Sequence, residues 1–139
     1  MDPEVWGPHA WILLHTITFN YPENPCLQDK NNIRLFFKYF SYQIPCNKCK
    51  NHFTKYMNKN PLTDKLLSSK DDLIDWLINA HNKVNKRNKK RIYSREEVIN
   101  YYEEIYNPSY KLYIYNYKFI LFILILILLL LIYYKDFIY

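Results

Sequence analysis

Apolar positions in the first hundred residues recur with the spacing of an α-helix. Residues 28–42 show this most clearly, because Ile33, Phe36, Phe37 and Phe40 follow one another at i, i+3, i+4 and i+7. The breaks between such segments contain proline, which cannot continue a helix. The helices predicted in this way cover residues 5–19, 28–42, 46–58, a stretch from Ser69 or Asp71 through Val84, and 94–106.

The fifth of these helices is short and opens with a capping box, Ser94 followed three residues later by Glu97. The first and fourth helices carry most of the expected core. The side chains expected on the inner faces of the first and fourth helices are Trp11, Leu14, His15, Thr18, Leu73, Trp76, Leu77, Ala80, His81 and Val84.

The C-terminal segment has a different pattern, since residues 119–132 are apolar without interruption. Fourteen residues span about 21 Å as a helix, less than the roughly 30 Å of a bilayer core, but tyrosines flank the run at both ends as interfacial aromatics do. A buried core helix is the alternative, and a domain of this size cannot surround it. We therefore predict a domain over residues 1–108, a linker over 109–118, a transmembrane helix over 119–134 (outer limits 112–134) and a tail over 135–139.

The lysines around this segment predict its orientation. Lys111 and Lys118 precede the span and Lys135 alone follows it. The positive-inside rule then places the domain in the cytosol or the interior of a virion, held by a single-pass tail anchor.

The single glycine, Gly7, excludes several enzyme classes. Without more glycines there is no GxGxxG dinucleotide turn, no GxxxxGK[ST] phosphate loop and no GxSxG nucleophile elbow. Hairpin turns of the Asn-Gly type are also absent. The fold class predicted is therefore all-α.

The net charge of +6 comes mainly from a run of lysines and arginines between Lys83 and Arg95. Such a run favours a polyanionic partner. Nucleic acid, anionic lipid and a nucleotide pyrophosphate all fit this description, and the charge alone does not distinguish them.

Two of the three cysteines form a CxxC motif, Cys46 and Cys49, next to Pro45 at the predicted start of a helix. A helix N-terminus and the neighbouring lysines stabilise a thiolate, which favours redox chemistry. With His52 the motif also resembles half of a zinc site, CxxCxxH, and a buried inert pair is the third possibility. The motif alone leaves all three open.

Two further constellations combine aromatic, imidazole and cationic groups. The first is WGPxxWxxxH, from Trp6 to His15, and the second is HNxVNxRxxK, from His81 to Lys90. In the second, a helix brings His81 and Asn85 to one face and places cations near its end, an arrangement that suits a nucleotide. Taken singly, each motif is more typical of core packing and solvated charge.

Together with the Tyr-Pro at 21–22 and the CxxC, these motifs resemble the FAD-linked sulfhydryl oxidases of the Erv/ALR family. The order and spacing match along about 100 residues. Among the members, the short oxidases of large cytoplasmic DNA viruses are the most similar.

The resemblance implies a fold, a cofactor and partners. The fold is a four-helix bundle plus a short fifth helix, usually a homodimer, with FAD at the mouth of the bundle. The partners are thiol-containing protein substrates and molecular oxygen, with hydrogen peroxide as product and neither nucleic acid nor metal. For a viral member, the disulfides formed would serve virion assembly.

The resemblance also implies roles for individual residues. Cys46 and Cys49 are catalytic, with Cys46 exposed to substrate and Cys49 next to the flavin. The residues implied in FAD binding are Gly7, Trp11, His15, His81, Asn82, Val84, Asn85, Arg87, Lys90, Tyr93 and Tyr102.

Two departures from the family pattern bear on these roles. Many cellular members have a structural cysteine where this chain has Ile78, so the bundle must hold without that disulfide. A separate shuttle pair is also missing, and Cys26 is left as a possible shuttle, a bridge across a dimer or a spare thiol.

Two other functions fit the residues without the resemblance. One is a tail-anchored zinc module that uses Cys46, Cys49 and His52. The other is a basic adaptor for nucleic acid or a membrane surface. Bound flavin distinguishes the oxidase from both, because only the oxidase is yellow.

Overall fold

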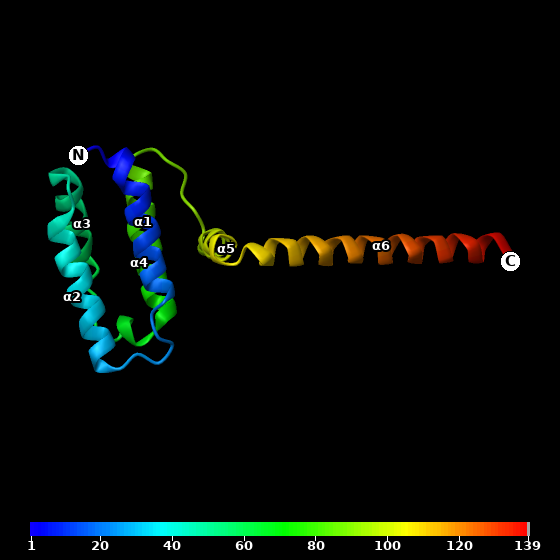
Figure 1. The fold of residues 1–139 in the computed structure, drawn as a ribbon, viewed down its shortest axis with the longest axis horizontal. Helices are drawn as coiled ribbons and strands as arrows, with labels where there is room; N and C mark the ends of the chain where they lie inside the picture. The colour runs from blue at the N-terminus through cyan, green and yellow to red at the C-terminus, as the bar shows by residue number, and fades with distance from the viewer. Residues whose placement is uncertain (139) are drawn as a thin grey trace. The chain divides into compact units, whose positions relative to one another are not determined.

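The computed structural model describes the backbone of residues 1–138 and the side chains of residues 1–107 and 115–134. These residues contain helices and no strand, which confirms the predicted all-α class (Figure 1). The chain divides into two compact units, Met1–Arg95 and Glu96–Tyr139. Their helices are α1 (Pro3–Phe19), α2 (Leu27–Gln43), α3 (Asn47–Lys59), the short 3₁₀ helix η1 (Leu66–Ser68), α4 (Lys70–Arg87), α5 (Arg95–Tyr106) and α6 (Pro108–Ile138).

The helices of the first unit begin at residues that cap free backbone N–H groups. The Asp2 carboxylate accepts a hydrogen bond from the Glu4 backbone N–H at 3.0 Å. Ser69 caps α4 in the same way, because its hydroxyl accepts from Asp72 at 3.1 Å, so Ser69 rather than Asp71 is the N-cap. Each such cap contributes about 1 kcal/mol to helix stability.

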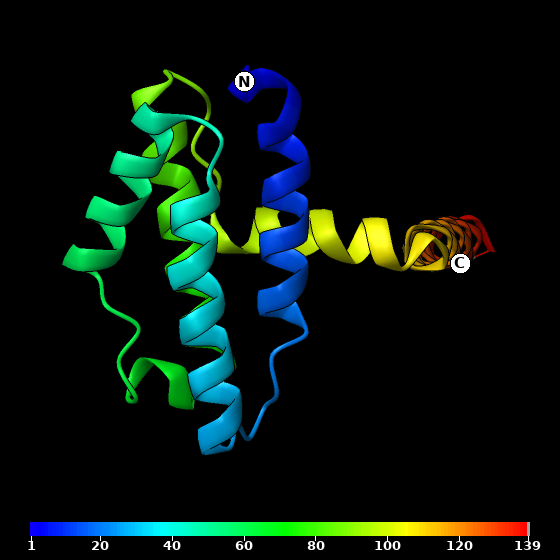
Figure 2. The same cartoon turned by 60° about the vertical axis from the view of Figure 1, so that its left-hand side comes forward.

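The four long helices of the first unit form an up-and-down bundle. In Figure 2, α1 and α3 run in one direction and α2 and α4 run in the other. The beginning of α1, the beginning of α3 and the end of α4 therefore lie at the same end of the bundle. The WG motif, the CxxC motif and the basic end of the HNxVN motif are brought together at this end.

Trp76 of α4 lies in the centre of the bundle core and is nearly fully buried. Its ring packs edge-on against Phe37 of α2, with 4.9 Å between ring centroids, and against Phe53 of α3. Its polar atoms are also satisfied, because its indole N–H donates to the Asn60 carbonyl at 2.7 Å and its carbonyl accepts from the Tyr56 hydroxyl at 2.8 Å. A buried aromatic with both kinds of contact fixes three helices around one side chain.

The predicted core is largely confirmed, with three exceptions. Leu14, His15, Thr18, Leu73, Trp76, Leu77 and Ala80 are buried, but Trp11, His81 and Val84 are only half-buried. His81 and Val84 lie in the last two turns of α4, where fewer side chains cover the helix, and Trp11 stacks against His81. Ile78, at the position where the resemblance implies a cysteine in many cellular members, is buried.

A Schellman motif ends α4. The Lys90 N–H donates to the Asn85 carbonyl at 2.8 Å, and the Lys89 N–H donates to the Lys86 carbonyl at 3.3 Å. This closure requires a left-handed residue, and Lys89 supplies it with φ of 54°. A residue with a Cβ adopts that conformation at a cost of roughly 1 kcal/mol relative to glycine.

Replacing Lys89 with glycine is therefore expected to raise the free energy of unfolding by about 1 kcal/mol. Urea denaturation followed by tryptophan fluorescence measures this change. The matched control is Asn88→Gly, one residue earlier, where φ is −86° and glycine only adds freedom to the unfolded chain. Equal effects of the two substitutions would contradict the strain at Lys89.

In the second unit, α6 contains a stretch that is long and apolar enough to cross a membrane. It covers Tyr115–Tyr134, 20 residues with a mean hydropathy of 2.6, and none of its side chains is buried. The predicted linker, residues 109–118, has helical backbone and lies within α6, because neither proline nor glycine interrupts it.

Candidate redox site

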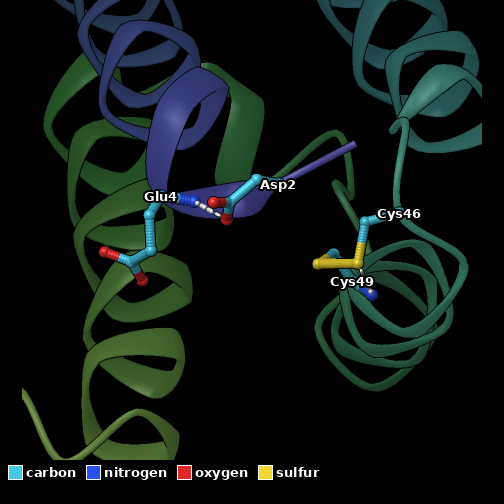
Figure 3. Close-up of a disulfide and its surroundings, with 4 residues drawn as sticks. All are labelled: Asp2, Glu4, Cys46 and Cys49. Atoms are coloured by element: carbon cyan, nitrogen blue, oxygen red, sulfur yellow. Dashed lines mark hydrogen bonds between the residues drawn. A yellow bond between two sulfur atoms is a disulfide. The ribbon is translucent and has the colours of Figure 1, made fainter.

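Cys46 and Cys49 are joined by a disulfide at the beginning of α3 (Figure 3). Cys46 is the N-cap of this helix, and its sulfur accepts a hydrogen bond from the Cys49 N–H at 3.2 Å. The preceding residue, Pro45, cannot extend α2, so the chain must restart a helix here. The motif thus places two sulfurs at a helix N-terminus, where the helix dipole stabilises negative charge on sulfur.

The two sulfurs have different surroundings. Both cysteines are half-buried, but Cys49 packs against the hydrophobic core of the bundle. Figure 3 shows the disulfide at the same end of the bundle as the first turn of α1, with Asp2 and Glu4. This arrangement agrees with an inner role for Cys49 and an outer role for Cys46.

The WG and HNxVN motifs meet where α1 packs against α4. Trp11 and His81 stack with ring centroids 4.0 Å apart and an angle of 6° between their planes. His15 Nε2 lies 3.2 Å from His81 Nδ1, close enough for a hydrogen bond between the rings. Residues 66 positions apart thus form one aromatic and imidazole cluster.

Both histidines of this cluster are neutral at physiological pH. Burial lowers the pKa of His15 to about 3, and the neighbouring His81 adds to the effect. Burial likewise lowers the pKa of His81 to about 4, with Lys90 as a further cause. Since both rings are neutral, one nitrogen of the close pair donates a hydrogen and the other accepts it.

The stability of the bundle is therefore expected to fall between pH 7 and pH 5. The folded-state pKa values of His15 and His81 lie below the ordinary 6.5, so the unfolded chain takes up protons first as the pH falls. The stabilising contribution is complete above about pH 6.5. At pH 5 each histidine loses on the order of 2 kcal/mol of it. Urea midpoints at pH 7.5 and pH 5 measure the loss.

Two variants test whether the pair is responsible. His15→Gln should reduce the pH dependence by about half, whereas substitution of the exposed His9 on the same helix should leave it unchanged. A urea midpoint that is constant between pH 7.5 and pH 5 would rule out the buried neutral pair.

The remaining predicted residues of the HNxVN motif surround the end of α4. Asn85 is buried, Val84 is half-buried and Arg87 is exposed. Burial lowers the pKa of His52, and the positive charge of nearby Arg87 lowers it further. Asn82 holds the following loop, because its side-chain amide donates to the Tyr93 carbonyl at 2.7 Å and accepts from the Tyr93 N–H at 3.1 Å.

Lys90 links this loop to the first helix. Its ammonium group forms a salt bridge of 2.9 Å with Glu4 of α1. Tyr102, the last predicted cofactor residue, lies in α5 in the second unit. The structure therefore gathers ten of the eleven predicted residues in the first unit, with Trp11, His15 and His81 in direct contact.

Two features of α1 show space and hydrogen-bonding capacity for a further group. The indole N–H of Trp6 is buried and has no partner among the described residues. Gly7 is buried, yet a Cβ added there would meet no atom within 4 Å beyond its own helix. Sequence reasoning included Gly7 among the candidates but not Trp6, although Trp6 stands first in the WG motif.

Cys26 lies at the other end of the bundle from the disulfide. It is exposed and forms the N-cap of α2, where its backbone N–H donates to the Asp29 carboxylate at 2.8 Å. The 17 residues of α2 separate it from the CxxC by about 25 Å. A relay role for Cys26 therefore requires the Cys26 of a second copy.

The sulfurs of the CxxC are not arranged for metal binding. They are bonded to each other, and among the side chains that the structure describes no three His, Cys, Asp or Glu groups come close enough to hold a metal ion.

Comparison with known proteins identifies the family. Residues 8–104 match the Erv1/Alr family. The chain is 38% identical over 111 residues to a probable FAD-linked sulfhydryl oxidase of Acanthamoeba polyphaga mimivirus, covering 80% of this chain and 78% of the relative. It is 35% identical over 99 residues to the FAD-linked sulfhydryl oxidase of African swine fever virus, covering 71% and 81%.

The fold agrees with the sequence match. The crystal structure of the FAD-binding domain of Erv1 from Saccharomyces cerevisiae superposes with a TM-score of 0.65 and 36% sequence identity, covering 75% of this chain and 92% of that domain. With a family match over most of the chain, and the CxxC disulfide at the end of the same bundle, the chain belongs to the Erv1/Alr family.

Proposed function

We propose that this protein is an FAD-linked thiol oxidase that forms disulfides in protein substrates with molecular oxygen as the acceptor. The observation that carries the proposal is the Cys46–Cys49 disulfide at a helix N-terminus, at the end of the bundle where the WG motif begins and the HNxVN motif ends. The names of the viral relatives and of the solved Erv1 domain support the same activity and cofactor.

The residues at this end of the bundle have the chemistry that FAD requires. Trp11 and His81 offer flat surfaces for stacking, and the neutral imidazoles offer hydrogen bonds without adding charge. The unpartnered Trp6 N–H and the open space at Gly7 suit a bound group. Arg87 and the other cations at the end of α4 would neutralise its phosphates.

The disulfide exchange requires one substrate dithiol for each turnover. A substrate thiolate attacks Sγ of Cys46, the Cys46–Cys49 bond breaks, and Cys49 leaves as a thiolate. The second substrate thiolate then attacks the mixed disulfide and displaces Cys46. The substrate has gained a disulfide, and its two electrons and two protons are now on the enzyme's cysteine pair.

The positions of the two sulfurs support this order of events. Cys49 leaves first, and as the sulfur packed on the core it is the one that would pass the electrons on to bound FAD. When bound, FAD would accept the two electrons and deliver them to oxygen to form hydrogen peroxide. We propose molecular oxygen as the electron acceptor.

The test of the function is direct. Full-length protein purified in detergent should be yellow, with about one FAD per chain, and should oxidise dithiothreitol while consuming oxygen and producing peroxide. Folded, colourless protein that neither binds added FAD nor oxidises dithiothreitol would exclude the oxidase.

The biological role and assembly follow from the same resemblance. Relatives from two large viruses support a role in making disulfides for virion proteins.

We also propose a homodimer, because α1 and α2 expose large apolar side chains that a second copy could cover. These side chains are Val5, Leu13, Leu35 and Tyr39.

The anchor proposal rests on the stretch Tyr115–Tyr134, whose apolar side chains are all exposed to solvent in the structure. An exposed apolar rod of this length would aggregate in water. We propose that it spans a membrane as a tail anchor, and that Lys111 and Lys118, which precede the uninterrupted apolar run that starts at Phe119, keep the oxidase domain in the cytosol or the virion interior.

Full-length protein is therefore expected to stay in the membrane pellet after extraction with alkaline carbonate, whereas a chain that ends at Asn107 should be released. The N-terminal domain should be digested when protease is added outside intact microsomes. Release of the full-length chain by carbonate would remove the anchor, and protection of the domain from protease would reverse the orientation.

A further inference from the structure

A groove lined by lysines lies on the same helix as the disulfide. It is a shallow, open depression of about 600 Å³ along α3, with Tyr42 at the end of α2 on its other side. Its lining contains three cations and no carboxylate. The lining residues are Tyr42, Lys50, Asn51, Thr54, Lys55, Asn58 and Lys59.

The charge of this groove is not balanced within the described part of the chain. The sequence of α3 contains four lysines and no aspartate or glutamate. No carboxylate among the described residues pairs with Lys50, Lys55 or Lys59, although several cations elsewhere in the bundle have such partners. The paired cations include Arg34 with Asp64, Lys70 with Glu23, Lys90 with Glu4, and Arg95 with Asp75.

The groove begins at Lys50, one helical turn from Cys46. Lys50 follows Cys49 directly, and its backbone N–H donates to the Cys46 carbonyl at 2.8 Å in the first turn of the helix. From Cys46 to Lys59 the helix extends about 20 Å, a length that about six residues of an extended peptide would match. A peptide whose cysteine reached Cys46 could thus lie along the whole groove.

We propose that this groove selects substrates in which acidic residues lie within about six positions of the reacting cysteine. This inference rests on the thiol oxidase function proposed above and adds a substrate class to it. The carboxylates of the substrate would pair with Lys50, Lys55 and Lys59 while its thiolate reaches Cys46. A thiol-bearing peptide is favoured over nucleic acid, because the groove begins one helical turn from the disulfide and offers a single aromatic ring for stacking.

Two synthetic dithiol peptides test this selection. They share one sequence, except that aspartate and glutamate near the cysteines of one are asparagine and glutamine in the other. With full-length protein in detergent at low ionic strength, kcat/KM for the acidic peptide should exceed that for its amide twin about tenfold, and added salt should reduce the difference. Equal values for the two peptides would overturn the proposal.

Charge reversal locates the effect in the groove. Lys55→Glu and Lys59→Glu should each lower kcat/KM for the acidic peptide by roughly threefold to tenfold and leave dithiothreitol oxidation unchanged. Lys65→Glu is the matched control, since Lys65 is also exposed and lies outside the groove. An equal loss in the control would assign the effect to net charge and overturn the groove.

Different outcomes refute the oxidase activity and the preference for acidic substrates. Failure to oxidise dithiothreitol would refute the oxidase itself. Oxidation of dithiothreitol and of both peptides at equal rates would refute the groove alone. Binding of a DNA oligonucleotide by the α3 lysines, without discrimination between the peptides, would also refute it and would assign the surface to nucleic acid.

Discussion

Cys46→Ser and Cys49→Ser are each expected to reduce thiol oxidation by roughly a thousandfold or more while FAD stays bound. Exchange requires both sulfurs, since one forms the mixed disulfide and the other resolves it. Neither substitution removes a side chain from the Trp11–His81 cluster, so the cofactor site is preserved. Oxygen consumption with dithiothreitol and the flavin absorption spectrum of the same sample measure the two properties.

Cys26→Ser is the matched control for these variants. Cys26 is the third cysteine and lies beyond the other end of α2, so its loss should leave dithiothreitol oxidation unchanged. If it serves as a relay between two copies, oxidation of a protein substrate should slow and that of dithiothreitol should not. Turnover at the unsubstituted rate in either CxxC variant would disprove the exchange mechanism.

The second large effect is expected at His81, whose replacement by alanine should cost the protein most of its FAD. The substitution removes the ring that stacks on Trp11 and the partner of His15 in one step. Loss of these contacts is expected to lower the free energy of unfolding by roughly 2–3 kcal/mol, because a buried imidazole loses its hydrogen bond. Flavin content after gel filtration and urea denaturation measure the two effects.

A conservative variant separates stacking from hydrogen bonding. His81→Phe keeps a flat ring against Trp11 and removes both ring nitrogens, including the Nδ1 that faces His15, so it should retain more flavin than His81→Ala. His9→Ala, at an exposed position of α1, should retain all of it. Full flavin content in His81→Ala would mean that this end of α4 does not hold the cofactor.

The helices could be predicted from the sequence because their signals are local. Apolar spacing defines the inner face of α2, and Pro45 and Ser69 determine where α3 and α4 start. The same holds for the apolar stretch of α6, which depends on composition alone. The 3₁₀ helix η1 was missed, since three residues are too few to show a period.

The contacts of the site were less predictable because they join distant parts of the chain. The sequence places Trp11 and His15 on one helix face and His81 on another, but the spacing within each motif does not reveal that the two faces stack. Trp6 was missed for a related reason, because an unpartnered N–H is a property of its surroundings. The positive φ of Lys89 was also hidden, since lysine is not a residue that usually takes that conformation.

Ile78 has a consequence for where this enzyme can work. The chain has three cysteines and its first unit contains one disulfide, which is also the reacting one and closes a loop of only four residues. No disulfide in the first unit therefore links one helix of the bundle to another, and the packing around Trp76 holds the helices together instead. A reducing cytosol can reduce the Cys46–Cys49 disulfide without breaking a bond that holds the helices together. A molecule that has lost its disulfide is therefore expected to stay folded and to be available for reoxidation.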